Sequence, residues 1–134
     1  ALAESPETVA KHGEAIVRKL EESDRGVLYA ALGALAESPE TVAKHGEAIV
    51  RKLEDSFEGV RCAAIGALAK SSEMVAKHGE AIVRKLEDSD RDVRFAALLA
   101  LARSPETVAK HGEAIVRKLE HSDEGVRRAA LGAL

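Results

Sequence analysis

The sequence predicts an all-α protein, a right-handed α-solenoid of four 33-residue helical repeats. First, the segment 9–21 recurs unchanged at 42–54, 75–87 and 108–120, an offset of 33 residues each time. Second, apolar residues recur at helical spacing, and no segment alternates as a strand would. Third, aromatic residues make up only 2% of the chain. The core must therefore be thin and built from small aliphatic side chains between closely approaching helices.

The four repeats are expected to form one domain, over about residues 5–37, 38–70, 71–103 and 104–134, with residues 1–4 as the remnant of a preceding repeat. A helix pair with one apolar stripe per helix cannot bury that stripe alone, whereas stacked copies can. Copies this uniform indicate recent tandem duplication or consensus engineering. Neither end shows a polar capping repeat, so we expect exposed apolar end faces that favour end-to-end self-association or belong to a longer array.

The first helix of each repeat is expected to begin at Ser5-Pro6-Glu7. Serine is a good N-cap, proline is tolerated at the first helical position, and glutamate suits the positive end of the helix dipole. Gly13 lies inside this helix and costs about 1 kcal/mol relative to alanine. We therefore expect a kink or break near His12, or a very close contact there. A break would give each repeat one short helix followed by two longer ones, as in armadillo repeats. The apolar face comprises Val9, Ile16, Val17 and Leu20.

The second helix is expected to begin at Ser23-Asp24, since both residues can cap a helix. It should end before Ser38-Pro39, because the residue before proline disfavours the helical conformation. Its apolar stripe comprises Val27, Ala30, Ala31, Ala34 and Leu35.

The second helix also carries a family resemblance. A period of 33 first suggests ankyrin and 34 the tetratricopeptide repeat, but the signatures of both are absent. The segment 90–101, Asp-Arg-Asp-Val-Arg-Phe-Ala-Ala-Leu-Leu-Ala-Leu, instead resembles the HEAT pattern D-x-x-V-R-x-x-A-x-x-A-L, and so does 123–134. The resemblance covers all four repeats, which are short for the family and most similar to artificial consensus ones. It implies that the second helices line a concave surface that grips partners.

The same resemblance implies a ladder of aspartate and arginine side chains between repeats. Asp24 would pair with Arg61, and Asp90 with Arg127. Phe57 replaces the aspartate of the second repeat, which would leave Arg94 without its ladder partner. At these arginines we favour the structural role over binding. Leu28 replaces the arginine of the first repeat.

The residues that differ between repeats cluster along the second helix. Positions 25, 29 and 33 are four residues apart and form a stripe on one face, which stacking would extend across the repeats. Tyrosine, phenylalanine and arginine are enriched at binding hot spots. We therefore predict a protein-recognition strip, with neutral drift or library randomisation of a solvent-exposed face as the alternative. The candidate protein-binding residues are Leu28, Tyr29, Phe57, Arg61, Cys62, Arg91, Arg94, Phe95, Leu99, Arg127 and Arg128.

The sequence predicts no catalytic residue, metal site or cofactor. Histidines 12, 45, 78 and 111 recur once per repeat, and stacked repeats would hold them about 8–10 Å apart, too far to share a zinc ion with ligands at about 2.0–2.1 Å. Cys62 has no recurrent histidine or acid beside it that would make it a nucleophile. No phosphate-binding loop, zinc motif or nucleophile elbow is present. The chain also shows no signal peptide and no apolar run long enough to span a membrane, which predicts a cytoplasmic-type protein.

These observations favour a non-enzymatic scaffold that binds a protein or peptide on its concave face. The alternative is a designed or idealised repeat protein with no natural ligand. Nucleic-acid binding, suggested by Arg94, Arg127 and Arg128, is a weaker third hypothesis, because the 20 basic and 23 acidic residues give a net charge of −3.

Overall fold

The computed structural model describes residues 6–22 and 24–119, and every regular element in these ranges is a helix or a short 3-10 turn. The all-α repeat solenoid is therefore confirmed. The first repeat contains α1 (Pro6–Arg18), η1 (Lys19–Glu21) and α2 (Arg25–Leu35). The second contains α3 (Pro39–Lys44), α4 (Gly46–Arg51), η2 (Lys52–Glu54) and α5 (Glu58–Leu68). The third contains α6 (Ser72–Lys77), α7 (Gly79–Arg84), η3 (Lys85–Glu87) and α8 (Arg91–Leu101), and α9 (Pro105–Leu119) follows.

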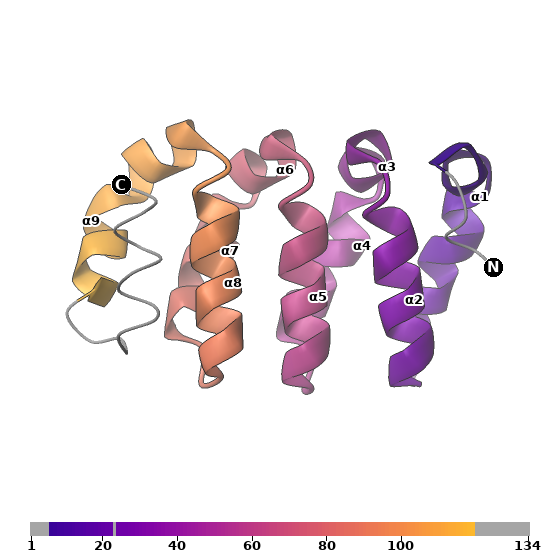
Figure 1. The fold of residues 1–134 in the computed structure, drawn as a ribbon, viewed down its shortest axis with the longest axis horizontal. Coiled ribbons are helices and arrows are strands. Elements are labelled where there is room, and N and C mark those ends of the chain that lie inside the picture. The colour runs from indigo at the N-terminus through magenta and orange to yellow at the C-terminus, as the bar shows by residue number, and fades with distance from the viewer. Residues whose placement is uncertain (1–5, 23, 120–134) are drawn as a thin grey trace.

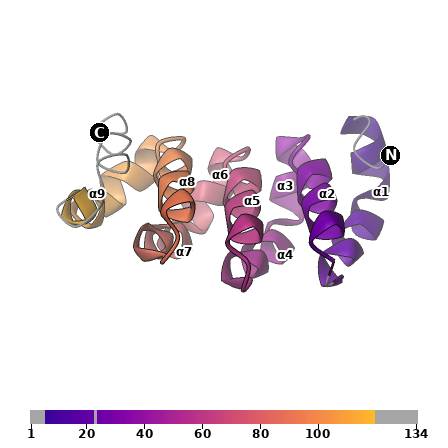
Figure 2. The same cartoon turned by 60° about the horizontal axis from the view of Figure 1, so that its bottom comes forward.

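The helices form layers that run along the length of the molecule. Figures 1 and 2 show α2, α5 and α8 side by side in one row, with α1, α4 and α7 in a second row behind them. The short helices α3 and α6 cross at the end where α2 and α5 finish (Figure 1). Contacts between α2 and α5 and between α5 and α8 join the repeats. Each second helix therefore has another second helix as its neighbour, which places equivalent positions next to one another.

The core consists of aliphatic side chains from both rows of helices. Val42, Ile49 and Leu53 from the first helices are at most 1% exposed, and so are Val60 and Ile65 from α5. Full burial of such a side chain contributes about 1.5–3 kcal/mol. The apolar face predicted for the first helix is thus the buried one in the second repeat. Among the described residues, no helix is both long and apolar enough to span a lipid bilayer.

The starts of α6 and α8 follow the predicted capping chemistry, whereas the start of α5 does not. Ser71 Oγ accepts the Met74 N–H at 3.2 Å, and Asp90 accepts the Val93 N–H at 3.1 Å. Phe57 occupies the N-cap of α5 and has no side-chain acceptor. Asp55, two residues earlier, accepts the Phe57 N–H at 3.0 Å, as Asp88 accepts the Asp90 N–H in the third repeat, and this bond does not replace the missing cap.

The break predicted at each histidine-glycine pair is present. His45 has φ −113° and ψ 19° between α3 and α4, and His78 adopts nearly the same conformation. A side chain of the next repeat also packs directly on the glycine. A Cβ on Gly13 would lie 2.8 Å from His45 Nε2, and one on Gly46 would overlap Met74 Sδ. Only the third segment is long, however, because α4 has six residues and its last turn tightens into the 3-10 turn η2.

Candidate functional site

The exposed large apolar side chains of α2 and α8 lie at the predicted strip. Tyr29 is 39% exposed, Phe95 40% and Leu99 50%. Cys62 holds the equivalent position on α5, between the two aromatic residues in the stack, and is half-buried. Because α2, α5 and α8 are neighbours (Figure 1), Tyr29, Cys62 and Phe95 form one line across three repeats, and Leu99 lies one turn beyond Phe95 on α8. We call these four residues the strip.

An aromatic and cationic cluster closes one end of the strip. The Tyr29 and Phe57 rings meet edge to face, with centroids 6.3 Å apart and an interplanar angle of 69°. The Arg25 guanidinium carbon lies 3.8 Å from the centroid of the Phe57 ring. Such a cation–π contact contributes about 0.5–1 kcal/mol at an exposed site. Arg25 was not among the predicted site residues, although it lies four residues before Tyr29 on the same face.

Tyr29 also packs against the next repeat. A Cβ on Gly59 would overlap the Tyr29 hydroxyl, so a larger residue at this position would displace the phenol from where it lies. At the following junction Cys62 takes the place of the tyrosine and Asp92 the place of the glycine. The large side chain thus faces the residue without a Cβ, and the small one faces aspartate. Sequence reasoning missed this match, although the same two positions vary together between repeats.

Arg61 forms an ion pair between repeats, but with a partner other than the predicted one. Its Nε and Nη2 donate to the two carboxylate oxygens of Asp88, both at 2.9 Å. Its Nη1 donates to the Asp55 carbonyl at 2.9 Å and to the Ser56 carbonyl at 3.2 Å. The predicted Asp24–Arg61 pair is wrong, because Asp24 caps its own helix by accepting the Val27 N–H. Arg61 therefore bonds both to the loop that precedes its own helix and to the following repeat.

The Asp88 carboxylate is held ionised by this arrangement. Burial alone would raise the pKa of Asp88, but the hydrogen bonds from Arg61 and from the Asp90 N–H, with the charges of Arg61 and Lys85, outweigh it and lower the pKa. The hydrogen bonds to Asp88 in turn raise the pKa of Arg61, although burial opposes them. The pair is nearly enclosed, with side-chain exposures of 13% for Arg61 and 7% for Asp88.

Arg94 is also satisfied without the predicted ladder. Its Nη1 donates to the carbonyls of Asp88 at 2.8 Å and Ser89 at 3.2 Å. The sequence predicts that Phe57 leaves Arg94 without its ladder partner; Phe57 offers no carboxylate, and Arg94 bonds instead to backbone carbonyls of the loop before its own helix. The candidates Arg127, predicted to pair with Asp90, and Arg128 lie outside the described residues.

Two further candidates change their role. Leu28 is only 4% exposed and belongs to the core, so it is removed from the surface available to a partner. Burial, followed by the charges of Asp90, Asp92 and Asp88, raises the pKa of the Cys62 thiol. Cys62 therefore contributes a neutral, weakly polar surface to the strip. Arg91, at the start of α8, is exposed as predicted for a surface residue.

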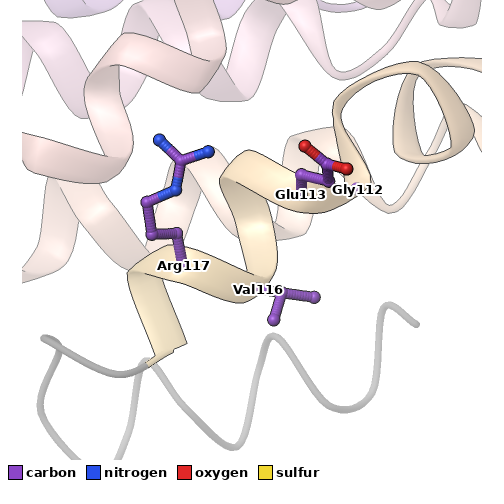
Figure 3. A pocket seen from close by; sticks show the side chains of 4 residues that line it. All are labelled: Gly112, Glu113, Val116 and Arg117. Atoms are coloured by element: carbon purple, nitrogen blue, oxygen red, sulfur yellow. The ribbon is translucent and has the colours of Figure 1, made fainter.

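The recurrent histidines lie at the helix breaks, away from the strip. His45 packs on Gly13, and His78 Nε2 is 3.5 Å from Glu47 Oε1. Within the described parts of the chain, no three histidine, cysteine or acidic side chains are grouped as metal ligands. A hollow on α9 is lined by Gly112, Glu113, Val116 and Arg117. Figure 3 shows that the Val116 and Arg117 side chains point in different directions, so they do not converge on one point in it.

A shallow groove lies beside the strip, between α5 and α8. It has a volume of about 470 Å³ and is lined by four alanines, Gly66, Lys70, Leu99 and Arg103. Arg103 Nε reaches across it and donates to the Ala69 carbonyl at 3.5 Å. The strip is therefore a surface with apolar projections and a hollow beside them.

Comparison with known proteins supports the fold. No protein-family model and no curated protein matches the sequence. A designed armadillo repeat protein in complex with the peptide (KR)4 is 26% identical with a TM-score of 0.69, over 98% of this chain and 69% of that one. Computationally designed armadillo repeat proteins for modular peptide recognition give 26% and 0.68, over 96% and 68%. An engineered protein gives 24% and 0.74, over 96% and 64%, and shows the fold alone. The chain is thus similar to armadillo- and HEAT-like helical repeat proteins.

Proposed function

We propose that the protein is a non-enzymatic repeat scaffold that binds an extended peptide or protein segment along the strip. The observation that carries this proposal is the line of Tyr29, Cys62 and Phe95 across three neighbouring helices, with Leu99 one turn beyond Phe95 on α8. The equivalent positions offer one contact per repeat, an aromatic ring at Tyr29 and Phe95 and a half-buried thiol at Cys62. The regular spacing of stacked helices, about 8–10 Å, matches about three residues of an extended chain, each rising about 3.3 Å.

The designed proteins with this fold support the same reading, since one was solved with a peptide and another was made for peptide recognition. The four residues of the strip do not form a cluster of buried polar side chains of the kind that enzymes use. Arg25 and Arg91, four residues before Tyr29 and Phe95 on the same helices, are exposed cations beside the strip, which suit recognition of a partner. The inference from the HEAT resemblance, that the second helices line a concave surface that binds partners, is part of this proposal.

The test is selection of binders from a random twelve-residue peptide library, followed by affinity measurement on variants. Tyr29→Ser and Phe95→Ser should each weaken a selected peptide by about tenfold or more, since a hot-spot residue contributes about 2 kcal/mol or more. Arg51→Ser is the control, because Arg51 is exposed on α4 in the other row of helices. Circular dichroism should show unchanged helix content in all three variants.

Selection of no peptide above background would support an idealised repeat protein without a ligand. Peptides that bind both serine variants as tightly as the parent chain would remove the strip from the proposal. Binding to random duplex DNA with a steep salt dependence would instead favour the nucleic-acid hypothesis.

A further inference from the structure

We propose that the groove between α5 and α8 is a specificity pocket that takes an apolar side chain flanked by acidic residues in the bound peptide. This inference rests on the proposed function and names the chemistry of the peptide at one place on the strip. The groove volume of about 470 Å³ is in the range of small-ligand sites. Its floor is made of small residues, so a leucine or phenylalanine side chain has room to enter.

The apolar character of the groove comes from one residue that differs between the repeats. Leu99 stands where the other repeats have glycine, and it is half exposed beside the groove. On the opposite side Gly66 has no atom within 4 Å of where a Cβ would lie. The groove thus has a leucine wall, an alanine floor and an open edge at Gly66. At the preceding junction, Gly33 and Gly66 occupy the two corresponding positions, so that junction lacks the leucine wall.

The charge comes from the residues that follow the two helices. Lys70 and Arg103 lie just beyond the C-terminal ends of α5 and α8, which share one edge of the molecule (Figure 1). Both line the groove, and none of its lining residues is acidic. At the preceding junction the residue equivalent to Lys70 is Glu37, so the same edge carries one charge of each sign there. Two cations beside an apolar groove are complementary to a peptide that carries carboxylates next to its apolar side chain.

The test uses a fluorescein-labelled six-residue peptide with a central leucine and aspartates on both sides. Such a peptide spans about 20 Å when extended, enough to cover the α5–α8 junction. Fluorescence anisotropy should detect binding that weakens as salt is added. A probe with serine in place of leucine, and one with lysines in place of the aspartates, should both bind at least about tenfold more weakly.

Gly66→Leu is the sharpest variant, because its side chain would fill the groove from an open surface position. It should abolish binding of the acidic leucine probe while circular dichroism shows a melting temperature no lower than that of the parent chain. Gly33→Leu is the matched control, the same change at an equally open position one repeat earlier, and should stay within about twofold of the parent affinity. Lys70→Glu with Arg103→Glu should weaken binding about tenfold.

Three outcomes would overturn the inference. They are no binding of the acidic leucine probe, equal binding of the lysine probe, and retention of affinity in Gly66→Leu. The proposed function is tested separately. Library peptides that lose affinity in Tyr29→Ser but not in Gly66→Leu would leave the strip in place and remove only the groove.

Discussion

Replacing Arg61 with leucine tests whether the link between the second and third repeats stabilises the stack. The variant removes two charge-assisted hydrogen bonds to Asp88 and two bonds to backbone carbonyls. Breaking a fully buried ion pair costs about 3–5 kcal/mol. With side chains 13% and 7% exposed, this pair should cost less, because water can reach part of it. Leu28 shows that leucine packs well at the equivalent position, so we expect a loss of about 2 kcal/mol.

The assay is urea unfolding at pH 7 followed by circular dichroism, with equal m-values required for comparison. Asp88→Asn and the double variant complete a double-mutant cycle, in which directly bonded groups show a coupling energy of about 0.5–3 kcal/mol. Because Arg61 lowers the pKa of Asp88, this stabilisation is complete above the unfolded aspartate pKa of about 3.9. It is lost as the pH falls through the lower folded pKa. A cost of less than about 0.5 kcal/mol for Arg61→Leu, or no coupling between the two substitutions, would refute the reasoning.

Three further predictions concern an enclosed glycine, an open glycine and a histidine at the helix breaks. Gly46→Ala should destabilise by about 1–3 kcal/mol, because its Cβ would displace the buried Met74 thioether. Gly66→Ala places its Cβ in open space and should be neutral or stabilise by up to about 1 kcal/mol. Thermal melts compare the two variants, and equal effects on stability would contradict a close Gly46–Met74 contact. His45 is the third case: burial, then the charge of Lys44, lowers its pKa despite Glu14. The unfolded chain therefore takes up a proton at this histidine before the folded chain does, as the pH falls below about 6.5. The free energy of unfolding should decrease below that pH in the parent chain and decrease less in His45→Asn. Parallel pH profiles of the free energy of unfolding in the two proteins would show that His45 does not cause the decrease.

The architecture could be predicted from the sequence because every repeat carries the same local signals for where helices begin, pack and break. The serine-proline starts, the helical spacing of apolar residues and the interior glycine all agree. The two alternatives at His12-Gly13, a break or a close contact, are both realised. The glycine accepts a side chain of the next repeat at the point where the helix bends. Only the length of the segment after the break differs, since the last turn tightens and shortens α4.

The inter-repeat contacts could not be predicted in the same way, because the pattern does not show whether an arginine bonds to the repeat before it or to the repeat after it. The predicted partner of Arg61 is Asp24 of the preceding repeat, whereas its carboxylate acceptor is Asp88 of the following one. Asp90 caps its own helix with one oxygen, whereas Asp88, two residues earlier, receives Arg61 of the preceding repeat. Both are aspartates close to a helix start, so the sequence alone does not separate them. Leu28 was misplaced for a related reason. It lies at the edge of the apolar stripe, and only the stacked neighbour decides that this edge is covered.

The fit of the Tyr29 phenol over Gly59 bears on how such an array can be extended or shuffled. If the third unit directly followed the first, the phenol would meet the Cβ of Asp92 in place of bare backbone. A newly inserted repeat therefore fits best after a repeat whose second helix matches it. The part that has to be kept together is the second helix of one repeat with the first turn of the second helix that follows. Extension of the array by whole 33-residue repeats would have to keep these matched pairs.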